Sequence, residues 1–197
     1  MDLQISVFLL FILFTAGHSL SCYECVSMMG SCDDQKLKTC PSGSSKCMSL
    51  TVIPQNQFSF KTKIKDCTVD CQSGSMNFGI SKVSSSCCNT DQCNVKDAPD
   101  PSNIPNGRKC YYCDGQTCSN TVSCSGTEDR CVKATVTVGS LSAVVKGCAT
   151  TSICDATFIP SVGGISCCAG NLCNGAQSVT QSFLFLCCSL LSYFMMH

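Results

Sequence analysis

The sequence predicts an all-β, disulfide-rich chain built from two similar units. Its 22 cysteines among 197 residues are about a tenth of all positions, a share typical of disulfide scaffolds. Two adjacent cysteines, four residues, a third cysteine and an asparagine stand at residues 87–94, and this motif returns at residues 167–174. Between the cysteines, short stretches alternate apolar and polar residues, which is the pattern of half-buried strands.

The repeat extends over ten cysteines in each unit. Both units contain a C-x2-C pair, three single cysteines, a long gap, two more singles, the adjacent pair and the closing Cys-Asn. Self-similarity of this length indicates tandem domains, which we place at residues 20–96 and 108–174. The linker between them, residues 97–107, has three prolines and an Asn-Gly step, which predict an extended chain with a turn. Whether the domains pack together stays open.

The longest cysteine-free gap in each domain predicts a β-hairpin. In the first domain the expected strands are residues 50–53 and 58–65, and the second of these alternates apolar residues and threonine with serine and lysine. In the second domain, residues 132–138 and 143–146 flank a turn that begins at Gly139 and Ser140. Neither domain has sustained helical periodicity, so we expect strands and long loops.

An apolar run near the N-terminus indicates secretion. Residues 7–14 are all apolar and are followed by small and polar residues, which is typical of a signal peptide and too short for a spanning helix of about 20 residues. We expect residues 1–19 to be removed by cleavage after Ser19. A retained signal anchor is the alternative, because no lysine or arginine precedes the apolar run.

A second apolar run, residues 183–196, ends the chain. A polar-leaning spacer at residues 175–182 precedes it, and Asn174, Gly175 and Ala176 are small residues. This order is typical of a glycosylphosphatidylinositol (GPI) signal. We expect lipid attachment at Asn174, or else at Gly175, with residues 175–197 removed as a propeptide. A short, weakly spanning helix is the alternative.

These residues carry a family resemblance. The run LSCYEC at residues 20–25, the ten-cysteine order and the closing Asn94 and Asn174 resemble the lymphocyte-antigen-6/urokinase-receptor domain family, which has the three-finger, snake-toxin-like fold. The resemblance covers residues 20–94 and 108–174 and implies two tandem three-finger domains. Such an arrangement is similar to urokinase-receptor-like surface proteins and to secreted two-domain inhibitors of phospholipase A2. The urokinase receptor itself has three such domains, so its ligand is not carried over.

Spacing alone leaves about 945 pairings of ten cysteines open in each domain. The family pattern, moved onto the matching positions, implies one set. In the first domain it gives Cys22–Cys47, Cys25–Cys32, Cys40–Cys67, Cys71–Cys87 and Cys88–Cys93. In the second it gives Cys110–Cys131, Cys113–Cys118, Cys124–Cys148, Cys154–Cys167 and Cys168–Cys173. Bridges that close loops of about 25 residues each stabilise such small domains by roughly 3 kcal/mol.

The residue types argue against catalysis, a cofactor or a metal. The C-x2-C pairs at Cys22 and Cys110 have zinc-ligand or redox spacing, but an even cysteine count in a secreted chain favours structural disulfides. The two histidines, His18 and His197, fall in segments that we expect to be removed. A mature chain without histidine lacks the usual base for an activated nucleophile. The balanced charge, with 13 basic and 13 acidic residues, gives no indication of a nucleic-acid partner.

Several loop and strand residues are candidates for contact with a partner. Lys61 and Lys63 could meet an acidic protein, although a solvated strand face is the more ordinary interpretation. Adaptable apolar side chains on loop tips could form a contact patch, with packing against the neighbouring domain as the equal alternative. These are Met28, Met29, Met76, Phe78 and Phe158.

The expected function is therefore non-enzymatic binding. We expect a GPI-anchored receptor on the outer leaflet of the plasma membrane that displays two three-finger domains to an extracellular protein partner, because loops on a rigid scaffold are where recognition concentrates. The alternative is a secreted inhibitor of an extracellular enzyme such as phospholipase A2. The C-terminal tail distinguishes them, since a circulating inhibitor has no use for a lipid anchor.

Overall fold

The computed structural model describes residues 19–28, 30–55, 60–156 and 162–175, and within them the chain is all-β. The first domain contains β1 (Ser21–Ser27), β2 (Lys36–Thr39), β3 (Lys46–Pro54), β4 (Thr62–Thr68), β5 (Gly74–Asn77), β6 (Ser81–Cys88) and the 3-10 turn η1 (Cys93–Val95). The second contains β7 (Pro105–Tyr112), β8 (Asn120–Ser125), β9 (Arg130–Val138), β10 (Leu141–Ala149), the one-turn helix α2 (Thr151–Cys154) and β11 (Val162–Cys168). The predicted hairpins are β3–β4 and β9–β10. The apolar runs at residues 7–14 and 183–196 lie outside the described residues.

Ten disulfides join the pairs that the family pattern implies. They form the centre of each domain, because the buried core of the first is built on Cys22, Cys40 and Cys47. The core of the second has the same composition at Cys110, Cys124, Cys131 and Cys148. Half-cystines thus take the place of the larger apolar side chains that a bigger domain would bury.

The two cysteine knots make the same contacts, as their repeated sequence requires. Asn94 accepts a hydrogen bond from the Tyr23 N–H (2.9 Å) and donates to the carbonyls of Tyr23 (2.8 Å) and Met48 (3.1 Å). Asn174 accepts from the Tyr111 N–H (2.9 Å) and donates to the Tyr111 carbonyl (3.0 Å). In each domain the closing asparagine therefore ties the end of the chain to the first strand.

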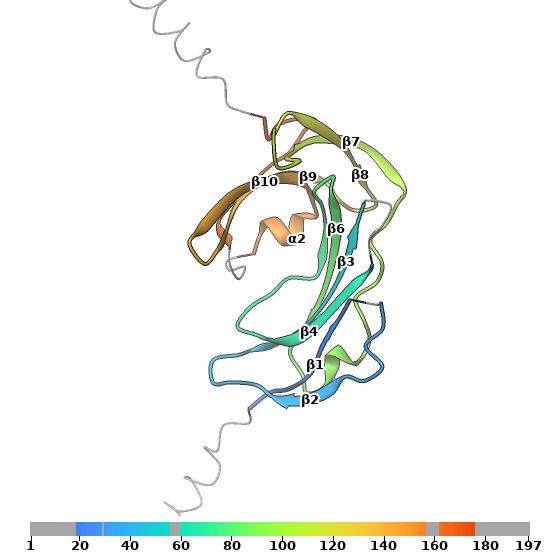
Figure 1. Cartoon of the computed structure of the whole chain (residues 1–197), viewed down its shortest axis with the longest axis vertical. Helices are drawn as coiled ribbons and strands as arrows, with labels where there is room; N and C mark the ends of the chain where they lie inside the picture. The colour runs from blue at the N-terminus through green and yellow to red at the C-terminus, as the bar shows by residue number, and fades with distance from the viewer. Residues whose placement is uncertain (1–18, 29, 56–59, 157–161, 176–197) are drawn as a thin grey trace, which may run out of the picture.

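The two domains share one sheet. Its order is β11-β9-β10-β5-β6-β3-β4-β1-β2, and β7 and β8 form a separate two-stranded sheet. The domains join where β5 runs antiparallel to β10, with Asn77 opposite Cys148 and Met76 opposite Ala149. Figure 1 shows the result, in which β9 and β10 of the second domain lie at one end of the β6-β3-β4 strands of the first. The open question of domain packing is thus answered by a continuous sheet.

Glycines allow this close approach. A Cβ on Gly147 would lie 2.2 Å from the Asn77 carbonyl oxygen, and a Cβ on Gly74 would lie 2.2 Å from the Thr150 hydroxyl. Hydrogen bonds then cross the junction, since the Thr150 N–H donates to the Ser75 carbonyl (3.0 Å). The junction is therefore a backbone-to-backbone contact at Gly147, while at Gly74 side chains of the second domain occupy the space that a Cβ would need.

Apolar side chains from both domains pack beside the β5–β10 pair. Met76 and Phe78 of the first domain pack against a buried cluster of the second, formed by Val132, Ala149 and Ile153. The sequence left two interpretations open for Met76 and Phe78, a contact patch for a partner or packing against the neighbouring domain. In the structure both residues pack against the neighbouring domain. Phe158 and Met29, two of the other candidates, lie outside the described residues.

The linker is docked along the first domain, and we call residues 97–104 the strap. The Ala98 N–H donates to the Ser49 hydroxyl (2.9 Å), and the Thr51 hydroxyl donates to the Ala98 carbonyl (2.8 Å). The Ser84 hydroxyl donates to the Pro99 carbonyl. Because Ser49, Thr51 and Ser84 are small polar residues of β3 and β6, one face of this sheet is polar and lies under the strap.

The strap also corrects the expected role of the lysine row. Lys61 pairs with Asp100 (2.6 Å), Lys63 pairs with Asp97, and Lys65 pairs with Asp97 at 3.0 Å. The Lys65 side chain is only 2% exposed. The acidic partner of the row is therefore the chain's own strap, and the solvent-facing row that the alternation suggested is wrong. Lys61 and Lys63, two of the candidate contacts for a partner, thus both have an acidic partner within the chain.

A buried polar network closes the junction beneath the strap. Glu128 of the second domain is fully buried, accepts from the Ser125 N–H (2.8 Å) and receives the Ser75 hydroxyl at 3.3 Å. Lys82 of the first domain donates to the Ser102 carbonyl of the strap (2.8 Å) and to the Ser125 hydroxyl (3.1 Å). Burial raises the pKa of Glu128, while the Ser125 N–H, the Lys82 charge and the Ser75 hydroxyl oppose that rise.

Candidate binding face

The face of the first-domain sheet opposite the strap is apolar. Direct opposition across neighbouring strands places side chains on one face. Leu50 of β3 lies opposite Ile64 of β4, and Ile64 lies opposite Val26 of β1. On the other edge of β3 the same face continues, because Val52 lies opposite Val83 of β6 and Val83 lies opposite Met76 of β5. We call this row the apolar face; β3 alternates Met48, Leu50 and Val52 on it with the serine and threonine under the strap.

The apolar face deepens into a hollow where the second domain meets it. The hollow has a volume of about 210 Å³, below the roughly 300–1,000 Å³ of pockets that enclose a drug-sized molecule. It is lined by Met48, Leu50, Asp70, Cys71, Gln72, Met76, Val83, Ser85, Ile153 and Ala156. Figure 1 shows α2, which carries Ile153, projecting from the second domain on the side of the β9–β10 hairpin. A hollow of this size accommodates a single side chain of a larger partner.

At the other end the apolar face is exposed to solvent. Val26 is 69% exposed, Met28 is 70% exposed and Phe60 is 69% exposed. Phe60 precedes β4 in the same alternation as Ile64, and Met28 follows β1 two residues after Val26. Large apolar side chains exposed together on a small domain mark an interaction surface. Met28, one of the residues selected from the sequence, thus stands beside this surface.

The charges near this surface are neutralised within the chain. Lys38 of β2 donates to Asp66 (2.8 Å) and Glu24 (2.7 Å), and these two hydrogen bonds, Asp66 first, raise the pKa of the Lys38 ammonium. Beside the hollow, Lys46 pairs with Asp70 at 2.7 Å. This face therefore presents apolar surface with paired charges around it rather than a net charge.

Sequence reasoning missed most of the apolar face. Val26, Leu50, Ile64 and Val83 come from four different strands, and only the register of the sheet brings them together. A partial signal was present in residues 48–52, which alternate methionine, leucine and valine with serine and threonine. That alternation identifies an apolar and a polar face, but it does not reveal that the polar one would be covered.

The adjacent carboxylates Glu128 and Asp129 each have structural hydrogen-bond partners. Glu128 is buried in the junction, and Asp129 accepts hydrogen bonds from the Thr151 N–H (2.9 Å) and hydroxyl (2.7 Å). The Thr151 hydroxyl is the main cause of the lowered pKa of Asp129.

In each domain three cysteine sulfurs lie close enough together to hold a metal ion: those of Cys22, Cys40 and Cys67, and those of Cys110, Cys124 and Cys148. All six cysteines are oxidised in disulfides. Within the described residues no helix is long and apolar enough to cross a bilayer.

Comparisons with known proteins identify both domains. The model of the u-PAR/Ly-6 domain matches residues 18–96, and the model of snake toxins and toxin-like proteins matches residues 108–174. The urokinase plasminogen activator surface receptors of Rattus norvegicus and Mus musculus are each 30% identical over 208 residues, covering 90% of this chain and 62% and 63% of the receptors. The CD59 glycoprotein of Sus scrofa is 30% identical over 82 residues, which are 42% of this chain and 63% of that protein.

The chain spans less than two thirds of the length of these relatives. The chain therefore consists of a u-PAR/Ly-6 domain, which is the domain of a non-enzymatic family, followed by a snake-toxin-like domain.

Proposed function

We propose that this chain is a cell-surface binding protein whose apolar face receives an extracellular protein partner. One observation carries the proposal: the polar face of the first-domain sheet is covered by the strap, whereas the apolar face is open. A folded chain normally covers its apolar face first, because burial of apolar surface stabilises by about 25 cal/mol per Å². An open apolar face with a hollow is therefore suited to a partner.

The expected partner places one apolar anchor in the hollow and further apolar contacts over Val26 and Phe60. A few buried anchors supply most of the affinity of a protein interface. Similarity to proteins named surface receptors supports this class of function. It does not identify the ligand, since this chain spans only part of their length.

The test is binding by the processed ectodomain, residues 20–175, which retains the knot asparagine Asn174. Biotinylated protein would be crosslinked to cells and to secreted proteins, and the captured partner quantified. The double variant Val26→Ser/Phe60→Ser removes two exposed side chains, so folding should be unaffected while capture falls about tenfold or more. Ile104→Ser/Leu141→Ser is the matched control, because Ile104 and Leu141 are equally exposed but lie outside the apolar face. Equal capture by both double variants would contradict the proposed face.

We also propose that a GPI anchor, attached at Asn174 with Gly175 as the second choice, holds the protein on the outer leaflet. The small residues, the spacer and the apolar tail support it. The Asn174 side chain is occupied in the knot, but attachment uses the main-chain carboxyl, so the two roles are compatible.

Phosphatidylinositol-specific phospholipase C applied to intact cells tests the anchor. Release of the protein into the medium is expected. Protein that stays on the cells with an epitope beyond residue 183 intact contradicts the anchor and supports a short spanning helix. Protein that leaves the cells without lipid supports the secreted alternative, for which inhibition of phospholipase A2 is the next assay.

A further inference from the structure

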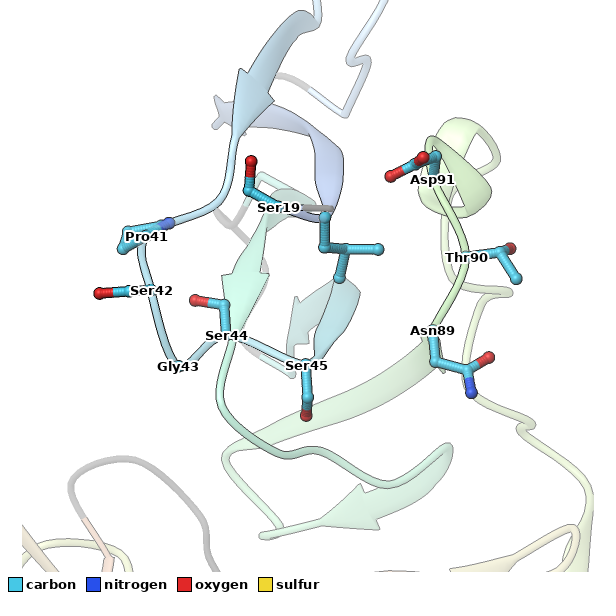
Figure 2. A pocket seen from close by; sticks show the side chains of 10 residues that line it. Ser19, Pro41, Ser42, Gly43, Ser44, Ser45, Asn89, Thr90 and Asp91 are labelled. Carbon is cyan, nitrogen blue, oxygen red and sulfur yellow. The ribbon is translucent and has the colours of Figure 1, made fainter. Parts of the chain in front are cut away.

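A pocket lined by both apolar and polar groups lies at the start of β1, where the mature chain would begin. Figure 2 shows it between the turn at residues 41–45 and the knot loop at residues 89–91, and Ser19 and Leu20 also line it. Hydroxyl, amide and carboxylate groups surround it. Asp91 is the only titratable side chain among the residues that line it, and among the described residues it forms no ion pair.

The first residues of the domain are fixed in this pocket from two sides. The Leu20 carbonyl accepts a hydrogen bond from the Cys40 N–H (2.7 Å), and the Leu20 side chain packs on the buried half-cystines of the first domain. The Ser21 N–H donates to the Asp91 carboxylate (2.8 Å), and the Ser21 carbonyl accepts from the Gln92 N–H (2.7 Å). The Leu20 nitrogen belongs to the residue immediately before Ser21, whose N–H is bonded to the Asp91 carboxylate, so the Leu20 nitrogen is held near that carboxylate.

The second domain repeats this arrangement with one change. The Lys109 N–H donates to the Asn171 side-chain oxygen (3.0 Å), and the Lys109 carbonyl accepts from the Leu172 N–H (2.8 Å). Gln92 and Leu172 also share the left-handed conformation, with φ of 57° in both. Asn171 therefore stands where Asp91 stands in the first domain, and it makes the same bond to the first strand without a charge.

The change from Asp91 to Asn171 matches a difference in how the chain enters the two domains. In the second domain the chain arrives from the strap, so the nitrogen before Lys109 is an ordinary amide. In the first domain, cleavage after Ser19 adds water across the Ser19–Leu20 peptide bond, leaves a carboxylate on Ser19 and gives Leu20 an amine that takes up a proton. The carboxylate is present in the domain where a new positive charge would arise, and the neutral amide in the domain where none would.

We propose that the pocket in Figure 2 is the seat of the mature N-terminus, where the Leu20 ammonium group lies with Asp91 as its counter-ion. The inference rests on the proposed signal-peptide cleavage after Ser19. An opposite charge within about 4–6 Å favours the charged form of a titratable group. Ser19 itself lines the pocket, so the cleavage that creates the Leu20 ammonium group also removes a lining residue.

The test compares the α-amino group of three secreted proteins: the wild type, Asp91→Asn and Asn171→Asp. N-terminal sequencing should first give Leu20 in each. The α-amino groups would then be methylated with ¹³C-formaldehyde, and their pKa measured by NMR titration at low salt. We expect Asp91→Asn to lower the α-amino pKa by roughly half a unit or more relative to the wild type. Asn171→Asp should leave it unchanged, because no ammonium lies beside that position.

Asp91→Asn is expected to fold, since an asparagine makes the equivalent bond in the second domain. Equal α-amino pKa values in the wild type and Asp91→Asn, with chains that begin at Leu20, would overturn the counter-ion and leave the cleavage site standing. A chain that begins at another residue would overturn both the cleavage after Ser19 and the inference. A shift that vanishes at high salt would support a charge–charge interaction.

Discussion

Asn94 and Asn174 are single residues on which each knot depends. Each is buried, and each satisfies main-chain groups on separate strands through one amide. Asparagine suits the position because its side chain both accepts and donates hydrogen bonds. An aspartate of the same shape would direct a carboxylate at carbonyl oxygens. The repetition of this residue after both knots is explained by geometry alone.

Replacement of Asn94 by alanine should destabilise the first domain by about 2–4 kcal/mol, because buried main-chain groups of Tyr23 and Met48 lose their partner. Guanidinium unfolding with the disulfides intact measures the change. Asn89→Ala, at an exposed residue of the same loop, is the control and should stay within about 0.5 kcal/mol of the wild type. Equal losses in the two variants would show that the buried hydrogen bonds of Asn94 are unimportant.

Glu128 should make the stability of the junction depend on pH. Its pKa is raised above the ordinary value of 4.5, so its contribution to stability is fully present below pH 4.5 and is lost as pH rises through the raised pKa. Glu128→Gln retains an acceptor for the Ser125 N–H and should flatten the pH dependence above 4.5. Unfolding titrations between pH 4 and pH 7 measure this. Asp129→Asn is the contrasting control: the Asp129 pKa is lowered, so its contribution is lost in acid instead.

At the scale of elements, the strap determines which face of the first domain is available. Its contacts come from residues of β3, β4 and β6 that share one face, and it covers the lysine row completely enough to bury Lys65. The strand alternation in the sequence correctly separated two faces. It could not assign them, because the aspartates that pair with the lysines lie more than 30 residues along the chain.

Asp97→Asn should loosen the strap. Burial works to raise the Asp97 pKa, but hydrogen bonds from Lys63 and Lys65 prevail and lower it, so the ionised form is the one that stabilises the fold. The amide would leave buried Lys65 without an opposite charge, and we expect a loss of about 1–3 kcal/mol and faster proteolysis of residues 97–104. Asp100→Asn, which breaks only the exposed pair with Lys61, should change little. Equal cleavage rates for both variants would contradict this role for Asp97.

For the molecule as a whole, the cysteine order predicted the fold class and the number of domains but not their union. The order of ten cysteines, present twice, carried the family resemblance that implied two three-finger domains, and the matching domain models agree. The sequence contained no comparable signal that β5 and β10 would join the two domains. β5 has only four residues, and its pairing with β10 depends on the missing side chains of Gly74 and Gly147, which read in a sequence as ordinary loop glycines.

Gly147→Ala should separate the domains, because the new Cβ would lie 2.2 Å from the Asn77 main-chain oxygen. Overpacking of this kind costs about 1–3 kcal/mol. Hydrogen exchange at the amides of β5 and β10 should speed up, and small-angle scattering should report a larger radius of gyration. Gly163→Ala is the matched control, since the nearest atom there lies at 3.8 Å. Unchanged exchange in Gly147→Ala would show that the β5–β10 pair accommodates the Cβ, and faster exchange with an unchanged radius of gyration would show that the pair is not needed to hold the domains together.

The short ladder between β5 and β10 has a mechanical consequence. A load applied to the first domain and resisted beyond the second domain passes through two parallel connections: the β5–β10 junction, with its packed side chains and polar network, and the covalent strap. The ladder opens first, because the strap is longer and remains attached through its own hydrogen bonds and ion pairs. As the strap then peels from its serines and lysines, it uncovers a row of positive charge, so tension would turn a hidden cationic face outward.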